Sequence, residues 1–107
     1  MKYVGVDIGG TNLKAGLVDE NGVLLATQKM KVASIADDDG LAWTVASLVQ
    51  ELAHTVNISV SDVASVGVGV PGTVEIRSGS INYTCTLPLR NVPLRKLFLR
   101  YLRIPLY

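Results

Sequence analysis

The chain has 107 residues and a mass of 11.4 kDa, which is enough for one domain and too little for two. Because 49% of the residues are hydrophobic and only 18% are charged, the composition excludes a disordered chain and predicts a buried core. The net charge of +1 conceals an asymmetry. Residues 1–75 carry four lysines and nine acids, a net charge of −5, whereas residues 76–107 carry six basic residues and no acid, a net charge of +6.

The chain shows no feature of a secreted, membrane or metal-cluster protein. Its single cysteine, Cys85, has no partner for an internal disulfide, so nothing points to an oxidising compartment. Gly5 and Asp7 interrupt the N-terminus where a signal peptide needs an apolar run, and no segment reaches the roughly 20 apolar residues of a membrane helix. We expect a cytoplasmic protein without membrane or nucleic-acid partners.

The first thirty residues predict three strands. Strand-forming residues occupy 3–8, and a second strand with alternating apolar and polar residues follows over 13–18. Asn21 and Gly22 tolerate the positive φ angles of a tight hairpin turn, after which residues 23–30 return as the third strand.

A helix is expected over residues 41–56, where apolar side chains recur at helical spacing. Asp37, Asp38 and Asp39 stand just before it, and we interpret them as the helix cap and first turn rather than as metal ligands. Residues 65–70, a run of small and β-branched residues without charge, predict a strand covered on both faces.

The last third predicts a short hairpin and a helix. Residues 74–76 and 80–83 are expected to pair around a Ser-Gly turn, and residues 94–102 to form an amphipathic helix. Its basic face is expected to lie in solvent and comprises Arg95, Lys96, Arg100 and Arg103. The predicted architecture is therefore α/β, with a mixed sheet in the order β-β-β-α-β followed by a short hairpin and a helix.

The strongest chemical signal is the segment DIGGTNLK at residues 7–14. Gly9 and Gly10 allow backbone N–H groups to approach a phosphate, and Thr11 adds a hydroxyl. Because Asp7 repels a phosphate, it fits such a site only with a cation between them, and a water-held Mg²⁺ meets that need. The residue types fit equally well a plain hairpin turn that Asp7 caps.

A second glycine segment, GVGVPG at residues 67–72, matches the spacing of the dinucleotide-binding fingerprint. That fingerprint requires a helix at the loop and an acid about 20 residues further on. Pro71 and the strand-like residues after it exclude the helix, and the downstream neighbourhood, residues 90–92, holds no acid. We therefore reject a Rossmann site here.

Three segments together resemble the ROK proteins, a family of repressors and sugar kinases that includes bacterial glucokinases. They are YVGVDIGGTNLKAGLVDENG, VASVGVGVPGTVE and SGSINYTCTLPLRNVPLRKLF, in this order and over nearly the whole chain. The resemblance implies the N-terminal lobe of the ribonuclease H-like ATPase fold shared by actin, hexokinases and Hsp70 chaperones, spanning residues 1–107.

The resemblance also implies the roles of individual residues. Those expected to line the ATP phosphates are Gly9, Gly10, Thr11, Asn12 and Lys14, while Asp7 assists the Mg²⁺. Those expected to border the sugar are Gly72, Thr73 and Thr86, where Thr86 stands at a position usually held by Asn in kinases of the family. A leucine-proline segment like the one at residues 104–107 leads, in this family, into a strand that carries the general-base aspartate.

These expectations favour an ATP-dependent hexose kinase of glucokinase type, homo-oligomeric in its full-length form and inactive as this chain alone. The general-base aspartate is expected just after Tyr107, and the structural Zn²⁺ site later still. Two alternatives remain: a sugar-sensing ROK transcription regulator without its DNA-binding domain, and a non-catalytic binding or assembly module of the same fold. Because Asp7 lies only six residues after Met1, no helix-turn-helix is expected ahead of it.

Overall fold

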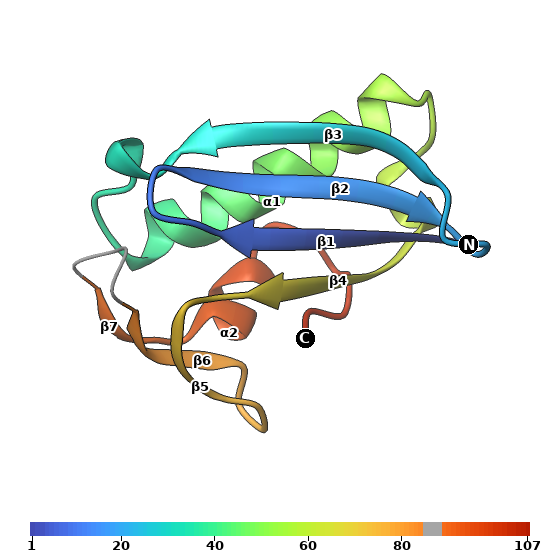
Figure 1. Ribbon diagram of the computed structural model, residues 1–107. Coiled ribbons are helices and arrows are strands. Elements are labelled where there is room, and N and C mark those ends of the chain that lie inside the picture. Colours follow the sequence, from blue (N-terminus) through green and yellow to red (C-terminus); the bar gives the residue numbers. More distant parts are fainter. Residues whose placement is uncertain (85–88) are drawn as a thin grey trace.

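A computed structural model describes residues 1–84 and 89–107. Its main feature is a four-stranded mixed sheet with the strand order β3-β2-β1-β4 (Figure 1). The strands are β1 (Lys2–Ile8), β2 (Asn12–Asp19), β3 (Leu24–Lys31) and β4 (Val63–Gly69). Neighbours along the chain pair antiparallel, while β1 and β4 run parallel, so the sequence-predicted mixed sheet is confirmed.

One face of this sheet is covered by helix α1 (Asp38–Thr55). Alternate residues of β1 and β2 turn toward it, among them Val4, Ile8 and Leu13, which are almost fully buried. The helix contributes an apolar stripe that repeats at helical spacing, including Leu41 and Leu48. The sequence prediction of a helix at residues 41–56 is thus confirmed, with its start three residues earlier.

A second, three-stranded antiparallel sheet lies beside the first, in the order β5-β6-β7. Its strands are β5 (Gly72–Glu75), β6 (Ser80–Thr84) and β7 (Arg90–Val92). Helix α2 (Leu94–Phe98) follows, and two short 3₁₀ turns, η1 (Val32–Ser34) and η2 (Val60–Asp62), flank α1 along the chain. The predicted hairpin is confirmed; β7, only three residues long, carries no periodicity and was not predicted.

The end of the chain returns to the free edge of β4. Leu106 forms a parallel bridge with Val66, supported by hydrogen bonds from the Val66 N–H to the Pro105 carbonyl (2.8 Å) and from the Val68 N–H to the Tyr107 carbonyl (2.9 Å). The last residues therefore begin to extend the main sheet beyond β4.

The final helix is shorter than predicted. Instead of spanning residues 94–102, α2 ends at Phe98, and tight turns follow in which the Tyr101 N–H bonds the Phe98 carbonyl. The chain leaves the helix so that Leu102 and Ile104 reach the core, where each is less than a tenth exposed. The Tyr101 hydroxyl donates a 2.6 Å hydrogen bond to Asp39, and this bond raises the pKa of Tyr101.

Two further predictions were wrong. Arg95 is not part of a solvated basic face, because its guanidinium is bonded to three backbone carbonyls. Within the described residues, strand β4 is covered on one face only: its valines turn toward α1, whereas Gly67 and Gly69 lie exposed on the opposite face. In β4, valines occupy the face toward α1, and glycines occupy the face that the described residues leave uncovered.

Among the described residues, none of the helices is both long and apolar enough to cross a membrane.

Candidate functional site

The candidate phosphate site lies where the carboxyl ends of the parallel strands β1 and β4 meet. Asp7, near the end of β1, is in register with Lys14 on β2 and with Gly69 on β4. The turn from β1 to β2 and the turn from β4 to β5 lie at the same end of the sheet, on the left in Figure 1. Residues far apart in the sequence are thereby brought to one edge.

The turn itself is closed by a backbone hydrogen bond of 3.0 Å from the Gly9 N–H to the Asn12 carbonyl. The Thr11 carbonyl accepts a second bond of 2.9 Å from Val32, which ties the turn to the chain after β3. Neither glycine has a positive φ. Gly9 has a steric reason to be glycine, because an added Cβ would stand 3.0 Å from the Asn12 carbonyl oxygen.

Gly10 has no such reason within residues 1–84 and 89–107. A Cβ added there would meet nothing within 4 Å, and the residue is exposed. The N–H groups of Gly10 and Thr11 make no hydrogen bond to the described part of the chain. Two neighbouring amide donors thus lack a partner among the described residues, and Gly10 has no side chain to block a phosphate from approaching them.

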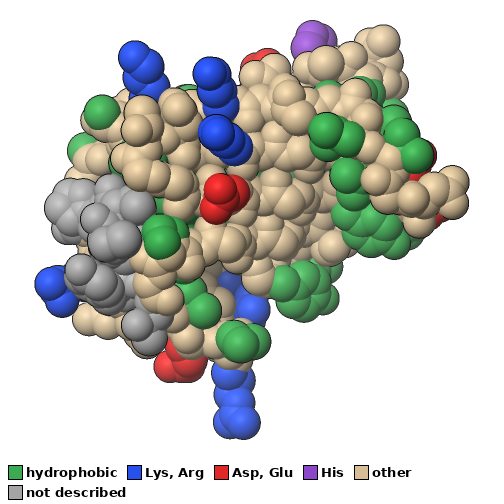
Figure 2. All heavy atoms as spheres, viewed as in Figure 1, with side chains coloured by type: hydrophobic (Ala, Val, Ile, Leu, Met, Phe, Trp, Pro, Cys, Tyr) green, Lys and Arg blue, Asp and Glu red, His purple; other side chains and the backbone are tan. Residues whose placement is uncertain are grey.

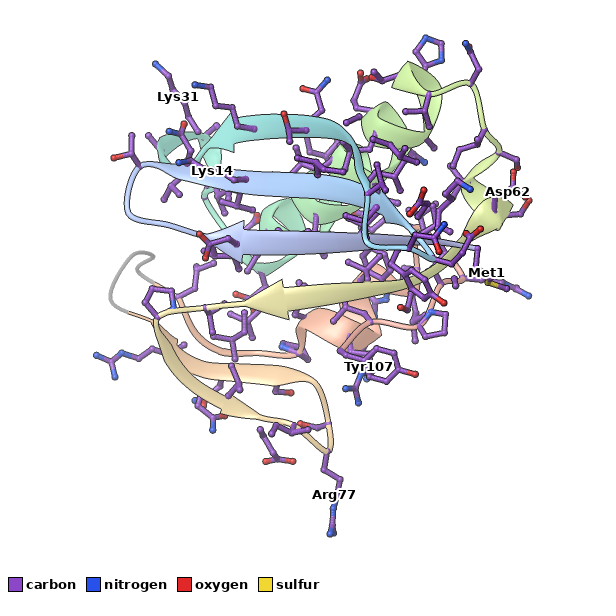
Figure 3. The ribbon with its side chains drawn as sticks, turned by 45° about the vertical axis from the view of Figure 1, so that its right-hand side comes forward. Met1, Lys14, Lys31, Asp62, Arg77 and Tyr107 are labelled. Atoms are coloured by element: carbon purple, nitrogen blue, oxygen red, sulfur yellow. The ribbon has the colours of Figure 1, made fainter. Side chains whose placement is uncertain are left out.

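Lysines surround this turn in greater number than the sequence analysis assigned. Lys14 pairs across the strands with Lys29, and Asn12 pairs with Lys31. Figure 3 shows Lys14 and Lys31 at the same end of the sheet. Directly opposed like charges destabilise a sheet, and within residues 1–84 and 89–107 neither Lys14 nor Lys29 forms an ion pair. The register adds Lys29 and Lys31 to the candidate site, and no local sequence pattern gives that register.

The residues predicted to border the sugar are only partly described. Gly72 is exposed and begins β5, directly after the turn that follows β4. The backbone of Thr73 continues that strand in register with Tyr83, while its side chain lies outside what the structure describes. Thr86 falls outside the described residues. No helix opens after the GVGVPG segment, because β5 follows it directly.

The arrangement combines exposed amide donors, three lysines and one carboxylate, which suits an anion together with a divalent cation. Asp7 is exposed, and no group of three or more His, Cys, Asp or Glu residues in the described part of the chain could hold a metal. A single carboxylate fits Mg²⁺, because that ion keeps several waters and completes its shell with phosphate oxygens. The residues present therefore fit a magnesium nucleotide better than a metal bound by protein alone.

Comparison with known proteins decides the family. The sequence profile of the ROK family matches residues 3–107. The chain belongs to the ROK family. It is 30% identical over 95 residues to a glucokinase of Streptomyces coelicolor and 32% identical over 100 residues to a glucokinase of Thermotoga maritima. These matches cover 87% and 88% of this chain.

Solved structures of ROK proteins have the same fold. A ROK family glucokinase from Streptomyces griseus was solved in complex with glucose and AMPPNP. It superposes with a TM-score of 0.82 at 28% identity, and the match covers 99% of this chain and 32% of the glucokinase chain. A ROK family transcriptional regulator, a homologue of the E. coli MLC protein, superposes with a TM-score of 0.81 at 18% identity. The match covers 98% of this chain and 26% of the regulator chain, and at this identity it shows a shared fold alone.

The match with these relatives is partial. The chain spans 27% of the Streptomyces coelicolor glucokinase and 28% of the Thermotoga maritima glucokinase. These ROK relatives are therefore much longer than the region compared.

Proposed function

We propose that this chain is the N-terminal lobe of an ATP-dependent hexose kinase of glucokinase type. Relatives at 30% identity or more include glucokinases and an N-acetyl-D-glucosamine kinase of Photobacterium profundum, and the Streptomyces griseus relative was solved with glucose and a nucleotide analogue. The observation that carries the proposal is Gly10: the N–H groups of residues 10 and 11 have no partner among the described residues, and nothing in that part of the chain requires glycine there. A ligand that approaches the turn closely explains why residue 10 is glycine.

In this proposal the turn holds the nucleotide phosphates. The N–H groups of Gly10 and Thr11 donate to phosphate oxygens, Gly9 and Asn12 close the turn that presents them, and Lys14 neutralises charge from the adjacent strand. Asp7 holds Mg²⁺ through water, and bound Mg²⁺ supplies charge neutralisation of the phosphates during phosphoryl transfer. Gly72 and Thr73 border the hexose in this proposal, and so does Thr86, which lies outside the described residues.

The proposal also predicts that the 107-residue chain does not turn over by itself. Phosphoryl transfer requires phosphate groups, sugar and a general base to be held together, and the base is expected on a strand that follows Tyr107. The structural Zn²⁺ site is expected further along, and the full-length enzyme is expected to be a homo-oligomer in the cytoplasm. A coupled assay for ATP-dependent glucose phosphorylation by the pure chain should give only the blank rate.

The test of the phosphate turn is an NMR titration of the ¹⁵N-labelled chain with Mg·AMPPNP. We expect shift changes concentrated at residues 9–14 and weak affinity, with a dissociation constant in the range of about 1 mM. Gly10→Val should raise that constant at least about 10-fold by covering the donors. Gly5→Val is the matched control, because it adds the same side chain at an equally open glycine outside the turn. Equal binding by wild type and Gly10→Val contradicts the proposal.

The regulator alternative has support in fold alone, at 18% identity. A regulator that senses sugar without phosphate chemistry needs no nucleotide at the turn. Mg·AMPPNP shifts that spread over the chain instead of gathering at residues 9–14 would favour it.

A further inference from the structure

The turn between β2 and β3 contains an asparagine followed by a glycine, Asn21 and Gly22, which the proposed function does not use. Both residues are exposed, and the turn lies beside the N-terminus, at the right-hand end of the molecule in the shared view of Figures 1 and 2. The Met1 amine pairs with Glu20 of this turn at 3.0 Å. The turn is therefore open to water.

The geometry of the turn does not require asparagine at position 21. Gly22 carries the positive φ of the turn, +78°, whereas Asn21 is not among the residues with a positive φ. The backbone N–H of Asn21 donates to the Asp19 carboxylate at 2.9 Å, but its side chain makes no hydrogen bond to the described part of the chain. The side-chain amide of Asn21 is thus exposed and unrestrained.

An asparagine that precedes glycine can lose its side-chain amide without an enzyme. The backbone nitrogen of the glycine loses its proton and attacks Cγ of the asparagine, which closes a five-membered succinimide ring; the side-chain NH₂ takes up a proton and leaves as ammonia. Water then opens either ring carbonyl and leaves aspartate or isoaspartate, with no oxidation or reduction. Glycine permits the ring because it has no Cβ to crowd it. Among the asparagines of the chain only Asn21 precedes glycine.

We propose that Asn21 is a site of spontaneous deamidation and that the Asp19 side chain controls its rate. The attacking nitrogen of Gly22 is held in a hydrogen bond of 3.0 Å to the Asp19 carbonyl. The Asp19 carboxylate accepts two more bonds, from the backbone N–H groups of Asn21 and Val23 at 2.9 and 3.0 Å. Ring closure requires rotation about the bonds of Asn21, which these hydrogen bonds oppose, so it proceeds from the locally opened turn.

The isoaspartate product acts beyond the turn, through the strand register. Isoaspartate carries the main chain through its Cβ and so adds one atom to the backbone of the turn. The turn closes with a bond of 3.1 Å from the Asp19 N–H to the Val23 carbonyl, and the ladder that starts there places Lys14 opposite Lys29. Since turn type and loop length fix the register of a hairpin, the longer turn disturbs the pairing of these two lysines. The inference stands independently of the proposed function.

The experiment incubates the folded chain at neutral pH and follows it by tryptic digestion and mass spectrometry. Cleavage after Lys14 and Lys29 releases residues 15–29, in which Asn21 is the only asparagine. We expect this peptide to gain about 1 Da and to separate into an aspartate and an isoaspartate form, while the peptides that carry the other asparagines keep their mass. The reaction should be slower than in a synthetic peptide of residues 15–29, which has no closed turn.

Asp19→Ala should raise the rate roughly 5-fold, because it removes the two side-chain hydrogen bonds that hold the turn closed. Glu20→Ala is the matched control: it removes the same charge from the neighbouring residue, whose carboxylate bonds the Met1 amine instead of the turn amides, and its rate should equal that of the wild type. If Asp19→Ala does not fold, the wild-type chain unfolded in urea takes its place, and its rate should rise to that of the synthetic peptide.

Three results would overturn the inference: no mass gain at residue 21 by the time the synthetic peptide is fully converted, equal rates for Asp19→Ala and Glu20→Ala, or equal rates for the folded chain and the peptide. The effect on the register is measured by ¹⁵N NMR of the purified isoaspartate form. The resonances of Lys14 and Lys29 should move while those of β5 to β7 stay in place, and unchanged resonances of both lysines would overturn the effect on the register.

Discussion

At the scale of single residues, Arg95 joins three parts of the chain that are distant in sequence. Its Nε donates to the Leu106 carbonyl at 2.8 Å, and its two terminal nitrogens donate to Arg77 and Ile76 at 2.8 and 3.1 Å. Gly79 makes room for this arrangement: its φ is +71°, and an added Cβ would stand 2.6 Å from the Arg95 side chain. The β5–β6 turn and the chain end are thereby fastened to α2.

Arg95→Met should therefore lower the free energy of unfolding by about 2 kcal/mol, because three bonds to carbonyls are lost while the apolar stem is kept. Urea unfolding followed by circular dichroism measures this change. Lys96→Met is the control, since that exposed neighbour should change stability by less than about 0.5 kcal/mol. Equal effects of the two substitutions would show that the bonds contribute nothing.

At the scale of elements, α1 begins with a side-chain cap. The Asp37 carboxylate accepts a 2.7 Å hydrogen bond from the Gly40 N–H, and Asp38 and Asp39 occupy the first turn. The sequence predicted this capping role, because an acidic cluster before an amphipathic stretch satisfies the unpaired N–H groups and the helix dipole.

Asp37→Ala should lower the free energy of unfolding by about 1 kcal/mol, whereas Asp37→Asn should change it by only a few tenths of that, because Asn also caps well. Thermal and urea unfolding both measure the difference. A loss with Asn as large as that with Ala would mean that the negative charge, rather than the cap, stabilises the helix.

The register of the β2–β3 hairpin could not be predicted from the sequence. The Asp19 N–H bonds the Val23 carbonyl, and counting from that closure would set Lys14 opposite Gln28. An irregularity between Leu17 and Val18 shifts the pairing by one residue, so Lys14 faces Lys29. A bulge of this kind depends on tertiary packing, which is why these lysines were missed although the strands were predicted.

The sequence predicted which residues form the candidate turn, but it did not decide whether the turn binds phosphate. Residues 7–14 fitted a phosphate site and a plain hairpin turn equally, since both use glycine. The structure separates the roles of Gly9, which the Asn12 carbonyl crowds, and Gly10, which no described residue crowds. Such a distinction requires atomic distances, which no local pattern carries.

At the scale of the whole molecule, both sheets share one core. Ile81 on β6 and Val92 on β7 belong to the same buried cluster as Val4 on β1 and Leu48 on α1, with Phe98 among them. The opposite charges of the two halves therefore do not divide the described residues into two separate cores.

A shared core predicts a single cooperative transition. Trp43, the only tryptophan, lies on α1 and is 51% exposed, so its fluorescence reports on the α1 side. Circular dichroism reports on both sheets. The two signals should give the same urea midpoint, and a separate, earlier transition in circular dichroism would mean that the β5–β7 sheet unfolds independently.

The parallel pairing of β1 with β4 sets the order in which the protein can fold during synthesis. Strands β1 to β3 form from neighbouring residues and can pair as soon as they leave the ribosome. The pairing of Val4 with Val66 forms only after β4 has been synthesised. Pairings between such distant residues form slowly. Until β4 arrives, the β1 edge exposes a row of unpaired N–H and C=O groups, the feature through which nascent chains join in aggregates. A chaperone that binds extended segments would therefore protect the β1 edge of the nascent chain until β4 has been synthesised.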